Sequence, residues 1–456
     1  MSLSRTTTAM EKKHVLVMAF PFGSHAAPLL DLVRSIAFAA PDVKFSFLNT
    51  SASNKSLFSN DNNDGGGCDN IKPYDVDDGF PVDYVFSGNP QQPVELFLKA
   101  TPGNFRTAMY EAVAETGRQI SCLISDAFLW FGADIAQGMN VPWIPLWTAA
   151  PQSLLVHVKT DEIREKVDRI GYDEKQIVEI SSDYSIQAAD MPEGVISGDL
   201  DSCYATMLLR MGRNLPKAKA VAINSFQDIH LKLVGELKDR FQSFLNIGPF
   251  SLKCPPTWTS DEHRCLEWLD QHEYASVAYI SFGRIATPPP HELIALAEAL
   301  EECKVPFLWS FRGNVDEKLP KGLIKRVGSR GKIVPWTVQL LVLAHPSVGV
   351  FVTHGGWNSI LESIIAGVPM ICRPFFGDQK INMRTLEKVW GFGIGLQGGV
   401  FTKNGAKEAL ELTLLRKEGW EMRDKIRGLK ENAYQSVGAD GSSTEDFNTL
   451  IDIITK

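Results

Sequence analysis

A histidine and an aspartate in the first third of the chain carry the side-chain types that acid–base chemistry needs. His25 follows a short apolar run at residues 14–19, and Asp126 ends another at residues 121–125. A histidine accepts a proton near neutral pH, and a carboxylate on its second nitrogen fixes the tautomer. Roughly a hundred residues separate the two, so only neighbouring strands can pair them. Without further information, His25 could equally be a buried histidine whose nitrogens are hydrogen-bonded within the protein. Asp126 could equally be the N-cap of the following helix.

A second group of polar residues surrounds the end of the apolar run at residues 348–353. His354 and the glycines 355–356 follow this run, and a helix is expected to begin near position 357, with Asn358 and Ser359 in its first turn. Glycines let a ligand approach the backbone, and the free N–H groups of a helix start bind anions. This pattern predicts a diphosphate site with His354, Asn358 and Ser359 as further donors.

Acceptor groups follow the predicted anion site. Glu362 lies four residues after Asn358, on the same helix face, and an ionised carboxylate suits two vicinal ribose hydroxyls. Asp378 and Gln379 combine carboxylate acceptors with an amide, which is suited to a polyhydroxylated sugar ring.

Alternating strands and helices must position these groups. Short apolar runs with the length of buried strands alternate with segments of helical periodicity in both halves of the chain. The predicted strands are residues 14–19, 45–48, 121–125, 143–146, 220–224, 276–282, 307–311, 332–335 and 348–353, and the predicted helices are 26–38, 97–115, 291–302, 420–436 and 444–455. We therefore expect an α/β protein with two doubly wound, Rossmann-like domains that face a cleft, with ligands beyond the carboxyl ends of the strands.

A segment with adjacent prolines and no periodicity separates the two series. It predicts an N-terminal domain at residues 1–250, a linker at 251–262 and a C-terminal domain at 263–440. The final helix, residues 441–456, is expected to pack back on the N-terminal domain.

Composition excludes several classes of partner. The chain has 456 residues with 46 Lys+Arg against 54 Asp+Glu, and its net charge of −8 disfavours nucleic acid. No run approaches the ~18 apolar residues of a membrane helix, so stable membrane insertion is not expected. Seven cysteines without metal-ligand spacing and a polar N-terminus favour the cytoplasm. No long heptad pattern demands a partner, and we expect a monomer.

Residues 336–379 as a whole resemble the 44-residue signature of plant secondary-product UDP-glycosyltransferases, which have the GT-B fold. First and last residues, length and interior polar residues all coincide. The segments FPFGSHAAPLL, SDAFLW and GVPMICRPFFGDQ are most similar to flavonoid and anthocyanidin 3-O-glucosyltransferases. The resemblance implies an inverting enzyme that moves glucose from UDP-glucose to a hydroxyl group of a flavonol or anthocyanidin. The hydroxyl group expected to accept the glucose is the one at position 3. It implies no cofactor beyond this co-substrate, and no metal.

The resemblance also assigns roles to individual residues. His25 and Asp126 correspond to the catalytic histidine and its partner. Gln379 corresponds to a position where glutamine goes with glucose and histidine with galactose. The donor-binding residues would be Trp336 on uracil, Thr337 beside it, Gln339 and Glu362 on ribose, His354, Asn358 and Ser359 on the diphosphate, and Thr148, Trp357, Asp378 and Gln379 on the sugar. The acceptor-binding residues would be Gly23, Gln91, Phe128, His157, Tyr204 and Phe376.

Several of these residues, and the protein as a whole, are also compatible with other roles. The two tryptophans, and the aromatic acceptor candidates, also fit core positions. Arg284 stands where relatives have Thr or Ser, and it either contacts a phosphate or crowds the donor. Gly355 replaces the usual Cys, and residues 337–338 replace the usual Ala-Pro. The competing functions are glycosyl transfer to another phenolic or terpenoid acceptor, and a non-catalytic flavonoid or UDP-sugar binder impaired by Arg284.

Overall fold

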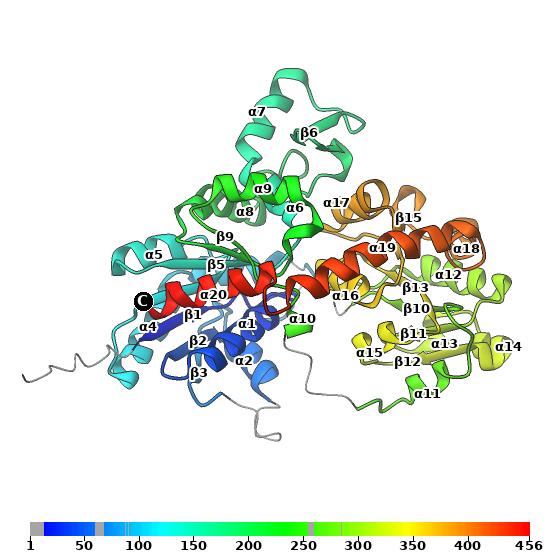
Figure 1. Cartoon of the computed structure of the whole chain (residues 1–456), viewed down its shortest axis with the longest axis horizontal. Helices are drawn as coiled ribbons and strands as arrows, with labels where there is room; N and C mark the ends of the chain where they lie inside the picture. Colours follow the sequence, from blue (N-terminus) through cyan, green and yellow to red (C-terminus); the bar gives the residue numbers. More distant parts are fainter. Residues whose placement is uncertain (1–12, 60–67, 87, 90, 254–259, 284) are drawn as a thin grey trace, which may run out of the picture.

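The computed structural model describes residues 13–59, 68–86, 88–89, 91–253, 260–283 and 285–456. Two parallel β-sheets, each covered by helices, form two halves that lie side by side (Figure 1). We call residues 13–253 the N-terminal half and residues 260–441 the C-terminal half. Arg284, for which the sequence leaves a phosphate contact and a crowded donor as alternatives, lies outside the described residues.

The N-terminal sheet has seven strands in the order β3-β2-β1-β4-β5-β8-β9, all parallel. Its strands are β1 (His14–Met18), β2 (Lys44–Thr50), β3 (Ile71–Val76), β4 (Cys122–Asp126), β5 (Trp143–Trp147), β8 (Val221–Ile223) and β9 (Phe244–Asn246). The helices of this half are α1 (Ala26–Ala39), α2 (Ser51–Phe58), α3 (Gln91–Ala100), α4 (Gly103–Thr116), α5 (Gly132–Met139), α6 (Pro151–Val158), α7 (Thr160–Ile170), α8 (Cys203–Asn214), α9 (Leu231–Arg240) and α10 (Phe250–Lys253). Several strands are buried throughout, as expected for a parallel sheet covered on both faces.

The C-terminal sheet has six parallel strands in the order β12-β11-β10-β13-β14-β15. These are β10 (Val277–Ser281), β11 (Phe307–Ser310), β12 (Gly331–Val334), β13 (Val348–Thr353), β14 (Met370–Cys372) and β15 (Gly393–Gly395). The helices of this half are α11 (Cys265–Leu269), α12 (Pro290–Cys303), α13 (Val315–Lys318), α14 (Leu323–Val327), α15 (Gln339–Ala344), α16 (Trp357–Ala366), α17 (Gln379–Arg384), α18 (Lys403–Leu414) and α19 (Lys417–Ser436), and α20 (Ser442–Thr455) follows it. The predicted α/β architecture with two doubly wound sheets is confirmed.

One predicted helix is wrong in its extent. The periodic stretch 97–115 is divided between α3 and α4, with a turn at residues 101–102. Pro102 has no N–H to donate within a helix, and it disfavours the helical conformation of Thr101. Apolar spacing continues across the break because both helices pack on the same core, where Phe97 and Phe105 are buried together with ring centroids 5.9 Å apart.

The last helix returns to the N-terminal half. Figure 1 shows α19 running along the C-terminal half and α20 lying over the N-terminal sheet beside α1. Leu450 and Ile454 of α20 are buried in the cluster formed by α1 and the neighbouring strands. The Asp446 carboxylate accepts the main-chain N–H of Asn246 in β9, at 2.8 Å. The two cores also interlock, because Ile381 of the C-terminal half is buried in the N-terminal core.

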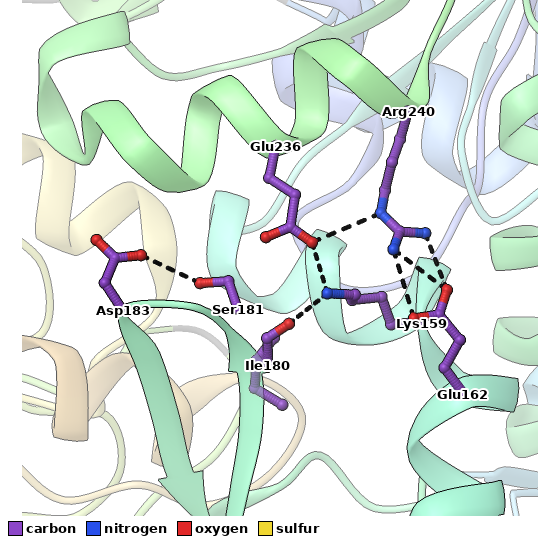
Figure 2. A network of polar contacts seen from close by, with 7 residues as sticks. All are labelled: Lys159, Glu162, Ile180, Ser181, Asp183, Glu236 and Arg240. Carbon is purple, nitrogen blue, oxygen red and sulfur yellow. Dashed lines mark hydrogen bonds and ion pairs between the residues drawn. The ribbon is translucent and has the colours of Figure 1, made fainter.

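A small cap projects from the N-terminal half. It consists of α7 and the antiparallel hairpin β6 (Ile177–Ser181)–β7 (Tyr184–Gln187). Figure 2 shows the polar network at its base: the Lys159 ammonium, between α6 and α7, donates to the Ile180 carbonyl and pairs with Glu236. Arg240 on α9 reaches both Glu236 and Glu162. These contacts link the junction of α6 and α7 to the hairpin and to α9.

No helix in the described part of the chain combines the length and the apolar composition that a membrane span requires.

Candidate active site

Both groups of candidate residues lie where the strand order of a sheet reverses. In the N-terminal sheet the reversal falls between β1 and β4, which pair directly. In the C-terminal sheet it falls between β10 and β13. The loops leave the sheet in opposite directions at such a point, which opens a crevice at the carboxyl ends of the strands. His25 follows β1 and Asp126 ends β4, whereas His354 follows β13.

The first group is a histidine held by a buried carboxylate. His25 Nδ1 lies 2.9 Å from Asp126 Oδ2, and the side chains are 18% and 1% exposed. Asp126 Oδ1 accepts the main-chain N–H of Phe128 at 2.9 Å, so both carboxylate oxygens are engaged. Thr148, directly after β5, places Oγ1 3.0 Å from the same histidine nitrogen. A carboxylate only accepts, so Nδ1 carries the proton and Nε2 is left to accept one from a substrate.

Aromatic rings enclose this imidazole. The Phe128 ring centroid lies 4.4 Å from that of His25, and the Phe20 centroid lies 5.3 Å away. Phe22 and Tyr204 extend the same group, at 5.3 Å from Phe20 and 6.1 Å from Phe128. Such a lining accommodates a planar aromatic molecule and keeps water from the base. Sequence reasoning missed Phe20 and Phe22, although their place between β1 and His25 could have indicated them.

The remaining acceptor candidates differ in burial. His157 on α6 is buried, and burial lowers its pKa to about 4, so its imidazole is neutral. Gly23 has φ +69°, a conformation that suits glycine, and lies beside the His25 ring. Gln91 and Phe376 are exposed, and a bound ligand would have to cover them.

The second group is built on the turn from β13 into α16. Burial lowers the pKa of His354 to about 4, which leaves a neutral imidazole at the start of α16. A side chain at Gly356 would meet His354 Nε2 at 2.5 Å, so this close approach requires glycine. Gly355 adopts φ +77°, where glycine is unstrained. The glycine that replaces the usual cysteine thus fits the backbone of this turn. Asn358 and Ser359 lie in the first turn of α16, as an anion site requires.

A hydrogen-bond chain presents a carboxylate beside this turn. The Tyr279 hydroxyl donates to Gln339 Oε1 at 3.1 Å and lies 2.7 Å from Thr337 Oγ1. The Gln339 amide nitrogen in turn donates to Glu362 Oε2. Burial raises the pKa of Glu362 to about 7, and the Gln339 bond opposes that shift. Sequence reasoning missed Tyr279, because an apolar strand gives no sign of which side chain bonds to the neighbouring loop.

The two candidate tryptophans lie in different surroundings. Trp336 is 40% exposed, which leaves surface for a stacked base. Trp357 is 3% exposed, and its indole N–H donates to the Asn224 carbonyl of the N-terminal half at 2.8 Å. The ring of Trp357 therefore occupies a core position at the interface. Its main-chain N–H, at the first position of α16, is the group that remains for a sugar hydroxyl.

Asp378 and Gln379 stand at the start of α17. The side-chain oxygen Oε1 of Gln379 accepts the main-chain N–H groups of Phe375 and Phe376, at 2.8 and 3.3 Å. The side-chain NH₂ group of Gln379 is then left for a ligand. Burial raises the pKa of Asp378, against hydrogen bonds from Asn382 and the Ala150 main chain and the attraction of His25. The packing of the two halves therefore places the Asp378 carboxyl close enough to His25 for the two side chains to interact electrostatically.

Across the residues that the structure describes, no group of three or more His, Cys, Asp or Glu side chains is arranged to hold a metal ion. The expectation of a metal-free reaction stays a prediction.

Comparison with known proteins identifies the class to which this architecture and this site belong. The family model described as UDP-glucoronosyl and UDP-glucosyl transferase matches residues 261–422. A flavonoid 3-O-glucosyltransferase of Medicago truncatula is 56% identical over 443 residues, with 97% of each chain covered. The chain belongs to this UDP-glycosyltransferase family.

Two further relatives extend the likeness over the whole chain. The anthocyanidin 3-O-glucosyltransferase UFGT of Vitis vinifera is 49% identical, with 100% of this chain and 99% of the relative covered. The crystal structure of a UDP-glucose: anthocyanidin 3-O-glucosyltransferase in complex with UDP superposes with a TM-score of 0.92 at 40% identity, covering 98% of this chain and 99% of that one. The fold is GT-B, as the resemblance predicted.

Proposed function

We propose that this protein transfers glucose from UDP-glucose to the 3-hydroxyl of a flavonol or anthocyanidin, with inversion at the anomeric carbon. The observation that carries the proposal is the His25–Asp126 pair, 2.9 Å apart at the strand-order reversal of the N-terminal sheet. The named activities of relatives at 49–56% identity over nearly the whole chain support the same substrates.

The first step is removal of the acceptor proton. His25 Nε2 takes the proton of the phenolic hydroxyl, while Asp126 holds Nδ1–H and stabilises the resulting imidazolium. The oxygen attacks the anomeric carbon from the face opposite the leaving UDP, so an α-linked donor gives a β-glucoside. The aromatic rings around His25 exclude the water that would hydrolyse the donor.

Apart from Thr148, the residues that would hold the donor belong to the C-terminal half. Trp336 would stack on uracil, and Thr337 would line the base beside it. Gln339 and Glu362 would hold the ribose. The N-terminus of α16, with His354, Asn358 and Ser359, would take the charge that develops on the departing diphosphate. Asp378, Gln379, Thr148 and the main chain of Trp357 would bind the sugar hydroxyls, and Gln379 supports glucose as the sugar.

The test is direct. The purified protein is incubated with UDP-glucose and quercetin, and the product is identified by chromatography and by the anomeric coupling in its proton spectrum. A β-linked 3-O-glucoside is the expected product. Absence of glucoside across a panel of flavonols and anthocyanidins would refute the proposal, and transfer to other phenolic or terpenoid acceptors would redirect it. An Arg284→Thr variant in the same panel tests whether that residue limits turnover.

We further propose that the enzyme works in the cytoplasm as a monomer. Cys122, Cys203, Cys265, Cys303 and Cys372 form no disulfide, which suits a reducing compartment. Light scattering after size exclusion checks the monomer, and a fluorescent fusion in plant cells checks the compartment.

A further inference from the structure

A buried amide on α17 connects the two halves of the molecule at the donor site. Asn382 is fully buried, and its Oδ1 accepts the Gln152 amide at 3.1 Å. Its Nδ2 donates to Asp378 Oδ2 at 2.9 Å and to the Gly355 carbonyl at 3.1 Å. Gln152 belongs to α6 of the N-terminal half and is 1% exposed. One side chain therefore touches the predicted sugar carboxylate, the diphosphate turn and the opposite half.

Hydrogen-bonding chemistry permits only one orientation of this amide. The Asp378 carboxylate and the Gly355 carbonyl can only accept, so both must face the NH₂ group of Asn382. The oxygen of Asn382 then faces Gln152, which must present its own NH₂. Every polar atom of the Asn382 side chain is engaged, and none has access to water to replace a lost partner.

The carboxylate at the end of this chain lies at the meeting point of both halves. Asp378 also receives the main-chain N–H of Ala150, and it interacts electrostatically with His25 and Tyr204. Ala150 immediately precedes α6, the helix that carries Gln152. The position of Asp378 relative to the base therefore depends on how α6 and α17 are held together.

We propose that Asn382 is a positioning residue for the donor sugar: Gln152 and the Gly355 carbonyl orient it, and it holds the Asp378 carboxylate in the geometry that binds the glucosyl hydroxyls. This inference deepens the proposed function and rests on it, because Asp378 is taken as a sugar ligand. Asn382 itself touches no substrate. Its effect falls on the sugar, while the uridine and ribose contacts lie elsewhere in the C-terminal half.

A simpler role would be to strengthen the interface between the halves. The interface has other buried polar contacts, among them the Tyr184 hydroxyl with Thr385 Oγ1 at 2.9 Å and Arg384 with Asp190 at 2.8 Å. Neither of these reaches Asp378 or the diphosphate turn through a bond that the structure shows. These two contacts serve as matched controls, because the loss of either contact should weaken the interface without moving the Asp378 carboxylate.

The experiment compares Asn382→Asp with Thr385→Val. Aspartate has nearly the same shape as asparagine, but its carboxylate cannot donate to Asp378 and repels it. Affinities for UDP and for UDP-glucose are measured by titration calorimetry, and kcat and KM are measured with quercetin. We expect Asn382→Asp to weaken UDP-glucose binding, or to lower kcat/KM, by about 30-fold, the range of a lost hydrogen bond to a charged group, and to change UDP affinity less than about threefold. Thr385→Val should change the affinities for UDP and for UDP-glucose only slightly.

The pH dependence distinguishes positioning from support of the interface. At lower pH the two neighbouring carboxyls share a proton, which restores an O–H donor between residues 382 and 378. The activity of Asn382→Asp relative to the wild type should therefore rise between pH 8 and pH 6. Gln152→Leu, which removes the orienting donor and leaves Asn382 in place, should show the same preference for UDP over UDP-glucose, to a smaller extent. It serves as the test if Asn382→Asp does not fold.

Equal losses for UDP and UDP-glucose, or a Thr385→Val variant as impaired as Asn382→Asp, would overturn the positioning role. The binding arm needs no acceptor. A wild-type protein that binds UDP-glucose but glucosylates no flavonol contradicts the proposed function alone, and the comparison of UDP with UDP-glucose still decides the role of Asn382.

Discussion

The two halves of the molecule use the same topological position in different ways. In the N-terminal half, the polar groups at the strand-order reversal come from three separate strands, since His25 follows β1, Asp126 ends β4 and Thr148 follows β5. In the C-terminal half, nearly all of them come from the continuous stretch 336–379. The first arrangement holds one histidine rigidly among aromatic rings. The second gathers many donors and acceptors in one stretch of chain, an arrangement that suits an extended ligand. Substitutions in the first should change the rate of chemistry, and those in the second the affinity for the donor.

The largest effect is expected from His25→Ala. Loss of a general base lowers rates by about 10²–10⁴-fold, and we expect about 10³-fold in kcat with quercetin. The affinity for UDP should stay within about twofold, because the base makes no contact with the nucleotide site. Steady-state kinetics and calorimetric titration measure the two quantities. His291→Ala, an exposed histidine on α12, is the control. A variant that retains the wild-type kcat would contradict the role of His25.

Glu362→Ala should give the opposite result. The carboxylate is oriented by Gln339 and is expected to accept two ribose hydroxyls, so its removal should weaken UDP binding by about 30-fold. Turnover at saturating UDP-glucose should fall much less. If UDP affinity were unchanged and kcat collapsed, the division of labour between the halves would be wrong.

The raised pKa of Glu362 predicts a pH effect on donor binding. The pKa lies at about 7 in the unliganded protein, and only the ionised carboxylate accepts from both hydroxyls. The affinity for UDP-glucose should therefore rise by about tenfold between pH 6 and pH 8, as the ionised fraction grows. Calorimetry across this range tests it, and Glu362→Gln should remove the dependence.

Trp357→Phe probes the contact between the halves. The indole N–H donates to the Asn224 carbonyl, and its loss leaves a buried carbonyl without this donor. We expect a loss of about 1–2 kcal/mol in the free energy of unfolding and a modest rise in the KM for UDP-glucose. Chemical denaturation and kinetics measure these effects. A KM change larger than that of Glu362→Ala would show that the indole itself binds the donor.

The smallest effect is expected from Lys159→Met at the base of the cap (Figure 2). Lys159 is 13% exposed and also donates to the Ile180 carbonyl, whereas Glu236 keeps a contact with Arg240, so the change should cost about 1–2 kcal/mol of stability and nothing in donor binding. Thermal unfolding should shift down by a few degrees, with donor affinity unchanged. A change in UDP affinity would show that the cap communicates with the C-terminal half.

The sequence predicted more of the donor site than of the base. Residues 348–379 are contiguous, so the turn, the helix start and the same-face carboxylate follow from local periodicity, and the structure places them together. The proximity of His25 and Asp126 depends on β1 pairing with β4, which no local pattern specifies. The resemblance to a family, rather than the spacing, identified that pair.

Three of the positions that escaped prediction share a physical cause. Each of these three residues bonds to a partner far away in the sequence. Tyr279 bonds to Thr337, 58 residues away, and Asn224 bonds to Trp357, 133 residues away. Asn382 bonds to Gln152, 230 residues away. Their types and local patterns do not distinguish them from ordinary strand or helix residues. The break at Pro102 was missed for a different reason, because apolar spacing continues across it and outweighed the proline in the prediction.

The path of α20 has a consequence for protein engineering. The N-terminal sheet is covered in part by residues from the far end of the chain, since Leu450 and Ile454 complete its core and Asp446 bonds to β9. The compact unit built on the N-terminal sheet thus consists of residues 13–253 together with α20, two segments that are far apart in the sequence. A chimera that exchanges the unit built on the N-terminal sheet between two such proteins needs two junctions, one near residue 254 and one near residue 440. A single-junction exchange would place a foreign helix against this core and expose it wherever the shapes differ.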